Sequence, residues 1–199
     1  MIRYAFTVIL ILIFSPIILF LFLFVYFYLL FKIKKPIFFI QERSGYKGRP
    51  FNIIKFRTMA LNKNNKKETF EKEKLRVLET TKWIRKSRLD ELPQILNILK
   101  GDIVLVGPRP LLMDYLNLYT EDEKKRLSVP PGLTGWAQIN DKNNYSWKEK
   151  FQMDIWYVDN RSLILDLKII YKTFFFLKRS FFNENKNEDI ITERYNGKN

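Results

Sequence analysis

Residues 4–31 form an apolar run without one charged residue, and no other feature constrains the chain as strongly. The run is rich in Leu, Ile, Phe and Val, and a helix needs roughly 20 apolar residues to cross a bilayer. It is too long for the apolar part of a cleaved signal peptide, and no small-residue cleavage site follows it. We therefore expect residues 1–35 to form a membrane helix.

Ser15 and Pro16 interrupt the middle of this run. Proline removes a backbone hydrogen bond and kinks a helix, and the Ser15 hydroxyl can bond a freed carbonyl. Basic residues flank both ends, with Arg3 before the run and three lysines within residues 32–35. Charge at both ends gives only a weak orientation signal. A kinked single-pass anchor and a re-entrant helix with both ends on one membrane face both fit these residues.

The composition limits the chemistry that the chain can use. Lys plus Arg is 35 and Asp plus Glu is 21, which gives a net charge of +14 and favours an anionic partner: a phospholipid surface, a phosphorylated substrate or nucleic acid. Cys and His are absent, which excludes disulfides, a thiol nucleophile, a His base and a His or thiolate metal site. Any bound metal should be a hard, oxygen-liganded ion such as Mg²⁺.

Residues 36–182 mix charged and apolar positions in short periods, and a segment of about 150 residues suffices for one compact domain. We predict short strands at residues 37–41 and 51–59, which a turn with two glycines separates. Residues 62–74 read as a mobile loop that leads into a helix, and residues 183–199 as a loose polar tail. The fold class is α+β and mainly helical.

A central helix is predicted to begin near Asp90, because Pro93 is tolerated only in a first turn. Asp90 can act as its N-cap, and Gly101 is a natural stop. Four apolar side chains fall on one face of this helix: Leu92, Ile95, Leu96 and Leu99.

Three further helix starts follow along the chain. Residues 120–123 match a capping box, Ser146 can cap the next helix, and Ser162 can cap the last. The last helix mixes basic and apolar positions. That pattern suits an amphipathic helix at a membrane interface, and a core helix with one solvated face fits it equally well.

The adjacent carboxylates Asp90 and Glu91 are the first candidates for chemistry. A helix N-terminus favours ionised carboxylates and also binds phosphates. Taken alone, the pair is better explained as a cap and a dipole partner than as a site. Arg109 lies between two prolines that stiffen its backbone, which suits bidentate phosphate binding, although an exposed Arg in a turn fits as well.

Three other charged residues complete the candidate set. Lys55 and Arg57 lie on a predicted strand and could face the same site, or simply a solvated strand face. Asp166 lies among apolar residues, where it could pair with a basic group, help to hold a metal, or lie on a helix surface. Together these residues describe a membrane-bound site suited to phosphoryl chemistry, where positioning and charge neutralisation do most of the catalysis.

Five segments, in this order, resemble the bacterial sugar transferases, which are monotopic polyprenyl-phosphate phosphoglycosyl transferases. They are residues 55–59 (KFRTM), 89–94 (LDELPQ), 99–102 (LKGD), 106–110 (VGPRP) and 131–138 (PGLTGWAQ). The short length, the Ser15-Pro16 break and the final YNGKN look closest to the small members that begin bacterial N-linked glycan assembly. Arg57 stands where we associate Lys with those members, and it keeps the charge.

The resemblance implies a two-step reaction in which Asp90 attacks the β-phosphate of a UDP-sugar, releases UMP and holds the phospho-sugar covalently. Undecaprenyl phosphate then takes the phospho-sugar. Glu91 would assist as a base or, with Asp90, as a Mg²⁺ ligand, and Lys55, Arg57, Arg109 and Asp166 would bind substrate. UDP-N,N′-diacetylbacillosamine is the implied donor.

The resemblance also implies a place in the cell. Ser15 and Pro16 would make the helix re-entrant, with the catalytic domain on the cytoplasmic face of the bacterial inner membrane. Membrane lipids and downstream glycosyltransferases would be partners, and nucleic acid would not.

Two other classes fit parts of the sequence. A non-catalytic membrane-tethered protein that binds anionic lipid or nucleic acid explains the charge, and a single-pass scaffold subunit explains the apolar run. Neither explains the stiffened Arg109 or the Asp90-Glu91 pair.

Overall fold

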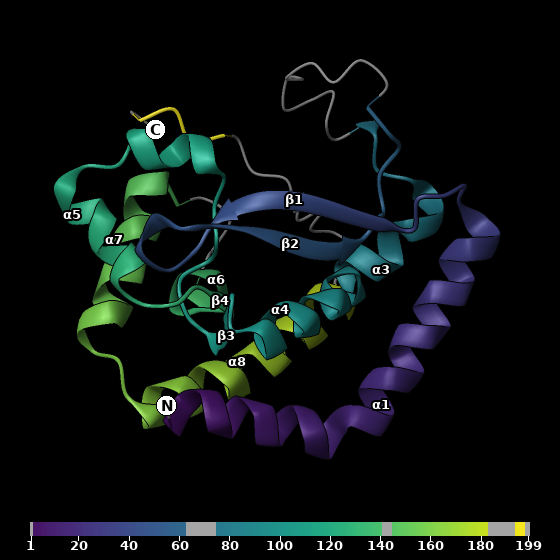
Figure 1. Ribbon diagram of the computed structural model, residues 1–199, viewed down its shortest axis with the longest axis horizontal. Helices are drawn as coiled ribbons and strands as arrows, with labels where there is room; N and C mark the ends of the chain where they lie inside the picture. Colours follow the sequence, from purple (N-terminus) through teal and green to yellow (C-terminus); the bar gives the residue numbers. More distant parts are fainter. Residues whose placement is uncertain (1, 63–74, 141–144, 183–193, 198–199) are drawn as a thin grey trace.

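A computed structural model describes residues 2–62, 75–140, 145–182 and 194–197 (Figure 1). Within these residues the fold is α+β and mainly helical, as predicted. The longer elements in chain order are α1 (Ile2–Lys32), β1 (Phe38–Ser44), β2 (Pro50–Phe56), α3 (Lys82–Lys86), α4 (Ile95–Lys100), β3 (Val104–Val106), α5 (Glu121–Lys124), β4 (Gly132–Thr134), α6 (Trp136–Asn140), α7 (Trp147–Asp159) and α8 (Leu163–Phe182). Short 3-10 helices lie between them: η1 (Tyr46–Gly48), η2 (Glu79–Thr81), η3 (Leu89–Gln94), η4 (Met113–Asn117) and η5 (Lys125–Ser128).

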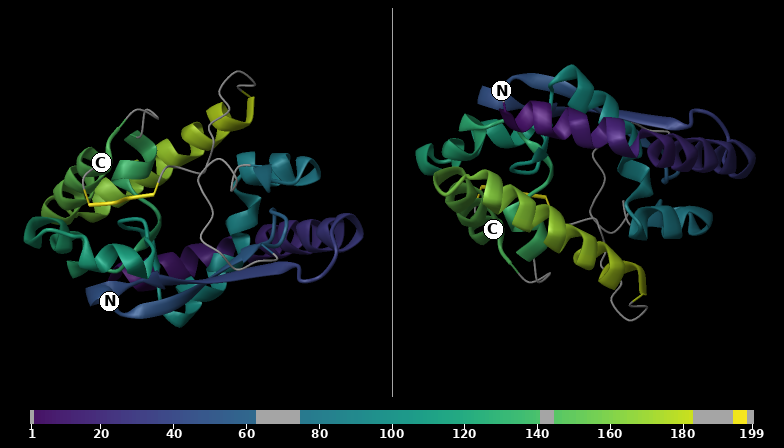
Figure 2. Two further views of the ribbon diagram at one scale, coloured as in Figure 1. Left: turned by 90° about the horizontal axis from the view of Figure 1, so that it is seen from above. Right: turned by 90° about the horizontal axis from the view of Figure 1, so that it is seen from below.

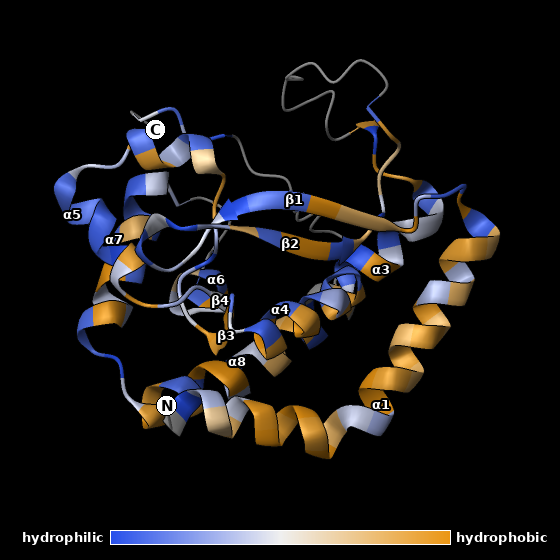
Figure 3. Cartoon of the chain, in the orientation of Figure 1, coloured by the Kyte–Doolittle hydropathy of each residue, from blue (hydrophilic) through white to orange (hydrophobic). Residues whose placement is uncertain are grey.

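The α1 helix bends in its middle and follows two sides of the molecule (Figure 1). Pro16 lies inside it, and the Ser15 hydroxyl donates to the Leu12 carbonyl at 2.7 Å, as expected for a serine beside a proline break. Among the described residues, this is the one helix long and apolar enough to cross a membrane. Most of its length is hydrophobic, and paler, more polar segments interrupt it at the bend and further along (Figure 3).

Both ends of α1 contact the folded domain, whereas its middle is exposed. At the start, the Tyr4 hydroxyl donates to the Leu99 carbonyl at 2.9 Å. Near the end, Val25 and Leu29 are fully buried in a cluster with Phe56 and Ile84. The exposed middle has large apolar side chains: Leu12, Ile13, Phe14, Ile17, Leu19 and Phe20.

The β1–β2 hairpin lies across the domain and confirms the two predicted strands with shifted ends. The first strand runs three residues beyond the predicted end, because its pairing continues to Ser44 opposite Pro50. The second ends at Phe56, and Met59 forms only an isolated bridge with Val77. The predicted mobile loop lies almost wholly outside the described residues.

A parallel pair, β3 and β4, brings two distant loops together. The Gly107 amide donates to the Thr134 carbonyl at 2.9 Å. A Cβ on Gly132 would lie only 2.1 Å from the Gly107 nitrogen, so the two backbones can meet this closely only with glycine. This junction fixes the start of the loop after β3, in which Arg109 lies.

The central helix differs from its prediction. It begins as the 3-10 turn η3 and becomes the α-helix α4, which ends as expected at Gly101 with φ +83°. The predicted apolar face is buried only in part: Leu92 packs against the cluster around Phe56, whereas Leu96 and Leu99 are 47% and 46% exposed. The inward position belongs to Asn97, which is fully buried and bonds the backbone of β2 at Asn52 and Ile54.

The three predicted caps at Thr120, Ser146 and Ser162 are confirmed. The last of them begins α8, which starts beside the N-terminus of α1 and diverges from it (Figures 1 and 2). Ile169 is fully buried against the domain. A row of apolar side chains on α8 is exposed: Ile164, Leu167, Tyr171, Phe174 and Phe175. Their spacing of three and four residues marks one face of an amphipathic helix.

The C-terminal tail corrects the prediction of a loose end where it is described. Tyr195 is 6% exposed and packs in an aromatic cluster with Tyr115, Tyr119 and Phe151. Its backbone amide donates to the Tyr115 hydroxyl at 3.0 Å. Burial of one large ring outweighs the polar character of its neighbours.

Candidate active site

The 3-10 turn η3 places Asp90 and Glu91 inside the domain, with 7% and 8% exposure. The prediction that Asp90 is the N-cap is wrong. The cap position belongs to Arg88, whose φ of +59° is in the left-handed region that non-glycine residues rarely adopt. Backbone strain of this kind persists where the surroundings enforce it, and it gathers at functional sites.

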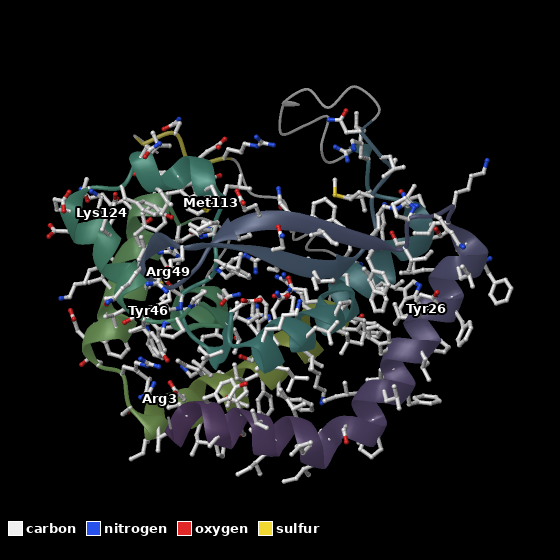
Figure 4. The ribbon with its side chains drawn as sticks, viewed as in Figure 1. Arg3, Tyr26, Tyr46, Arg49, Met113 and Lys124 are labelled. Carbon is white, nitrogen blue, oxygen red and sulfur yellow. The ribbon has the colours of Figure 1, made fainter. Side chains whose placement is uncertain are left out.

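Glu91 is the centre of a cluster of cations. Its Oε1 lies 2.6 Å from Lys55 Nζ, 3.7 Å from an Arg88 nitrogen and 3.7 Å from an Arg109 nitrogen. These partners come from β2, the cap residue before η3 and the loop after β3. Polar side chains fill the space between the hairpin and the α3–α4 region (Figure 4). The structure therefore brings together four of the predicted site residues: Lys55, Asp90, Glu91 and Arg109.

The pKa values of the two carboxylates are shifted in opposite directions. Burial alone would raise the pKa of Glu91, but Lys55, Arg109 and Arg88 hold this pKa well below its usual range. Glu91 is therefore a weak base. Burial lowers the pKa of Lys55, and Glu91 opposes that shift.

Asp90 has the opposite shift. Burial, followed by repulsion from Glu91, raises its pKa to about 6, against the pull of Lys55, Arg85 and Arg88. Its Oδ1 is buried without a hydrogen-bond partner. A buried polar atom without a partner carries a desolvation cost, so it calls for an explanation such as a catalytic role. Because no hydrogen bond occupies this oxygen, its lone pairs are free to form a bond, as a carboxylate nucleophile requires.

Arg109 is held by its backbone. The Gly107–Gly132 junction fixes the start of its loop, and Arg126 Nη2 donates to the Arg109 carbonyl at 2.7 Å. Arg126 is itself fixed by a buried ion pair with Asp154 at 2.7 Å. These contacts fix the backbone of Arg109, while its side chain is 36% exposed and reaches to 3.7 Å from Glu91 Oε1.

Two predicted site residues lie elsewhere. Arg57 donates to the backbone carbonyls of Lys34, Pro36 and Met59, so it ties the linker after α1 to the hairpin. Asp166 pairs with Arg3 at 2.8 Å and accepts a hydrogen bond from Tyr157 at 2.7 Å. Of the alternatives for Asp166, pairing with a basic residue is the one observed. Both residues join α1 to the domain.

Arg43, Arg85 and Arg88 adjoin the carboxylates and were not predicted as site residues. Arg85 and Arg88 both lower the Asp90 pKa, and Arg43 lines the same cleft as Lys55, Glu91 and Arg109. Arg43 could have been found from the hairpin register, since it lies four pairs along the hairpin from Lys55 and therefore on the same face.

The carboxylates suit a metal shared with a substrate. Within the described ranges, no group of three acidic side chains forms a metal cage. Mg²⁺ is commonly held by one or two carboxylates together with substrate phosphates. The adjacent carboxylates of Asp90 and Glu91 fit that pattern.

Comparison with known sequences defines the class. Residues 1–180 match the model of the bacterial sugar transferase family. The chain belongs to this family.

Three relatives show the range of the family. The chain is 56% identical over 142 residues to the uncharacterized sugar transferase EpsL of Bacillus subtilis, covering 71% of this chain and 70% of that protein. It is 35% identical over 154 residues to the undecaprenyl-phosphate galactose phosphotransferase of Salmonella typhimurium, covering 69% and 32%.

The third relative is the UDP-N-acetylgalactosamine-undecaprenyl-phosphate N-acetylgalactosaminephosphotransferase of Aeromonas hydrophila. It is 37% identical over 177 residues, which cover 83% of this chain and 40% of that protein. The chain thus spans most of the first relative and less than half of the other two.

Proposed function

We propose that the protein transfers a phospho-sugar from a UDP-sugar to undecaprenyl phosphate and releases UMP. The observation that carries this proposal is Asp90: a buried carboxylate with an unpartnered oxygen, beside a cluster of Lys and Arg side chains. Family membership and the names of the relatives support the same reaction.

The reaction proceeds through an aspartyl phospho-sugar. Asp90 Oδ1 forms a bond to the β-phosphorus, and the bond from that phosphorus to the UMP oxygen breaks. Lys55 and Arg109 neutralise negative charge that develops around the reacting phosphorus. A phosphate oxygen of undecaprenyl phosphate then bonds to the same phosphorus, and the Asp90 carboxylate leaves.

Glu91 organises the site rather than moving a proton. Its low pKa makes it a weak base, and a phosphate acceptor that is already ionised needs none. Its ion pairs hold Lys55 and Arg109 around the reacting phosphates.

Mg²⁺ is the proposed cofactor, with Asp90 and Glu91 as the protein ligands. When bound, it would offset negative charge on the diphosphate. Activity should fall to background after exhaustive chelation and return with Mg²⁺. Full activity in a chelator-treated, metal-free preparation would remove the metal from the proposal.

We place the catalytic domain on the cytoplasmic face of the inner membrane, with α1 re-entrant. Both ends of α1 contact the same domain, which supports entry and exit by one face. The exposed apolar row of α8 suits the membrane interface, where the lipid acceptor resides. The lipid-linked product would then pass to enzymes that extend it, such as glycosyltransferases.

We propose UDP-N,N′-diacetylbacillosamine as the sugar donor, on the basis of the motif resemblance. The relatives' names include galactose and N-acetylgalactosamine, so a panel of all three UDP-sugars tests the choice. The full chain in nanodiscs should release UMP from a UDP-sugar. Repeated turnover, with more than one UMP per enzyme molecule, should require undecaprenyl phosphate. No UMP with any donor would reject the enzyme and favour a lipid-binding tether.

A further inference from the structure

Arg43, in the cleft beside the two carboxylates, has a buried hydrogen-bond donor that no group of the described protein satisfies. Its Nε is buried without a hydrogen-bond partner, and its one side-chain bond runs from Nη2 to Gln41 Oε1 at 2.6 Å. Leaving a buried donor unpaired costs about 1–3 kcal/mol. A guanidinium offers five donors in a planar fork, so most of that capacity is left for another molecule.

The hairpin register directs Arg43 to the same side as Lys55. Opposite pairs share a face, and Arg43↔Phe51, Gln41↔Ile53 and Phe39↔Lys55 are successive pairs on one face. Arg43, Ile53 and Lys55 all line the cleft. The alternation of the strands therefore places two cations along one wall of the cleft.

The charge balance of this cleft favours an anion. Arg43, Lys55 and Arg109 line it, and Glu91 is the one carboxylate among its lining residues. Glu91 is already engaged at 2.6 Å by Lys55. Burial, with repulsion from Arg109, lowers the pKa of Arg43 to about 10, which still leaves it charged at neutral pH.

We propose that Arg43 binds the nucleotide-side phosphate of the UDP-sugar, which becomes the phosphate of the leaving UMP. This inference rests on the proposed function. Along β1, Arg43 lies four residues from the residue opposite Lys55, about 13 Å of strand. Lys55 meets Glu91 next to Asp90, so the reacting phosphate belongs at that end and the other phosphate toward Arg43. A bidentate fork suits a phosphate with two free oxygens.

Nucleotide binding tests this without catalysis. The probes are UDP and UMP, titrated calorimetrically into the full chain in nanodiscs. Arg43→Ala should weaken both nucleotides by roughly ten- to a hundredfold, the usual effect of a lost hydrogen bond to a charged group. Arg49→Ala is the matched control: Arg49 is exposed on the same hairpin, is labelled in Figure 4, and should leave both affinities unchanged.

Arg43→Lys keeps the charge and serves if the alanine variant fails to fold. It should also weaken both nucleotides, because an ammonium cannot form the fork. Wild-type affinity for UMP in either folded variant would overturn this inference alone. Failure of the wild-type chain to bind UDP would overturn the proposed function, and the inference with it.

Discussion

Arg3 and Asp166 form an ion pair, with 2.8 Å between Arg3 Nη1 and Asp166 Oδ2, that joins the first turn of α1 to the first turn of α8. Tyr157 completes the contact, since its hydroxyl donates to Asp166 Oδ1 at 2.7 Å. The start of the membrane helix is therefore fastened to the domain whose core also encloses the helix's other end. In Figure 4 the labelled Arg3 lies where the two helices begin.

Removal of this ion pair should release the N-terminal turns of α1. We expect Arg3→Ala to increase amide hydrogen exchange in residues 2–14, because a charged hydrogen bond worth about 1.5–3 kcal/mol is lost. Lys32→Ala, an exposed lysine at the other end of the helix, is the charge-matched control and should leave exchange there unchanged. Identical exchange in Arg3→Ala and the wild type would mean that the ion pair does not hold the helix.

The bend at Ser15 and Pro16 should decide the topology of α1. In the native sequence, single Cys residues placed before Arg3 and after Lys35 should both be shielded from an impermeant reagent outside intact cells. The chain has no Cys of its own, so each label reports one position. Replacing Ser15 and Pro16 by Ala and Leu restores the backbone donor and lets the helix straighten and span. Periplasmic labelling of the native N-terminal Cys would reject the re-entrant helix.

The local signals in the sequence predicted much of the fold. The long apolar helix, the hairpin, the stop at Gly101 and the caps at Thr120 and Ser146 each depend on a few neighbouring residues. Each of those signals acts within one element, so the packing of the rest of the chain does not override it.

Long-range contacts determine which side chains face inward and which charged residues meet, and local sequence patterns do not predict these contacts. The buried Asn97 clamp on β2 turned Leu96 and Leu99 outward, against the apolar periodicity. The grouping of Lys55, Glu91 and Arg109 depends on the packing of three separate segments, and the motif resemblance, rather than the spacing, united them. Arg57 and Asp166 had the right charge, but their partners are backbone carbonyls and Arg3.

Arg109→Lys should lose roughly ten- to a hundredfold in kcat/KM while the protein stays folded, because lysine keeps the charge but not the bidentate fork. UMP release measures the loss, and thermal unfolding checks the fold. Arg49→Lys makes the same change at an exposed position of the hairpin and should keep the wild-type rate. A wild-type kcat/KM in Arg109→Lys would exclude the bidentate role.

Asp90→Asn should stabilise the protein at neutral pH. The folded pKa of Asp90 is about 6 against an ordinary 3.8, so the fold favours the protonated carboxyl. That contribution is fully present below about pH 4 and is lost as the pH rises through 6, which leaves the ionised group destabilising at pH 7. The neutral amide removes this penalty, worth up to about 3 kcal/mol.

Thermal unfolding at pH 7 and pH 4 measures the difference between Asp90→Asn and the wild type. The gain should be present at pH 7 and small at pH 4. Asp159→Asn, on α7, is the control and should change little at either pH, because its ion pair with Lys125 is solvent-exposed and such pairs contribute little to stability. A less stable Asp90→Asn at pH 7 would contradict the raised pKa.

Mass spectrometry of the covalent intermediate tests the central claim most directly. The full chain is incubated with a UDP-sugar that it turns over, without undecaprenyl phosphate, quenched and digested. We predict one phospho-sugar adduct on the peptide that contains Asp90, its disappearance when undecaprenyl phosphate is added, and no adduct in Asp90→Asn. A turning-over enzyme that never carries phospho-sugar on Asp90, or an Asp90→Asn variant that turns over at the wild-type rate, would contradict the account.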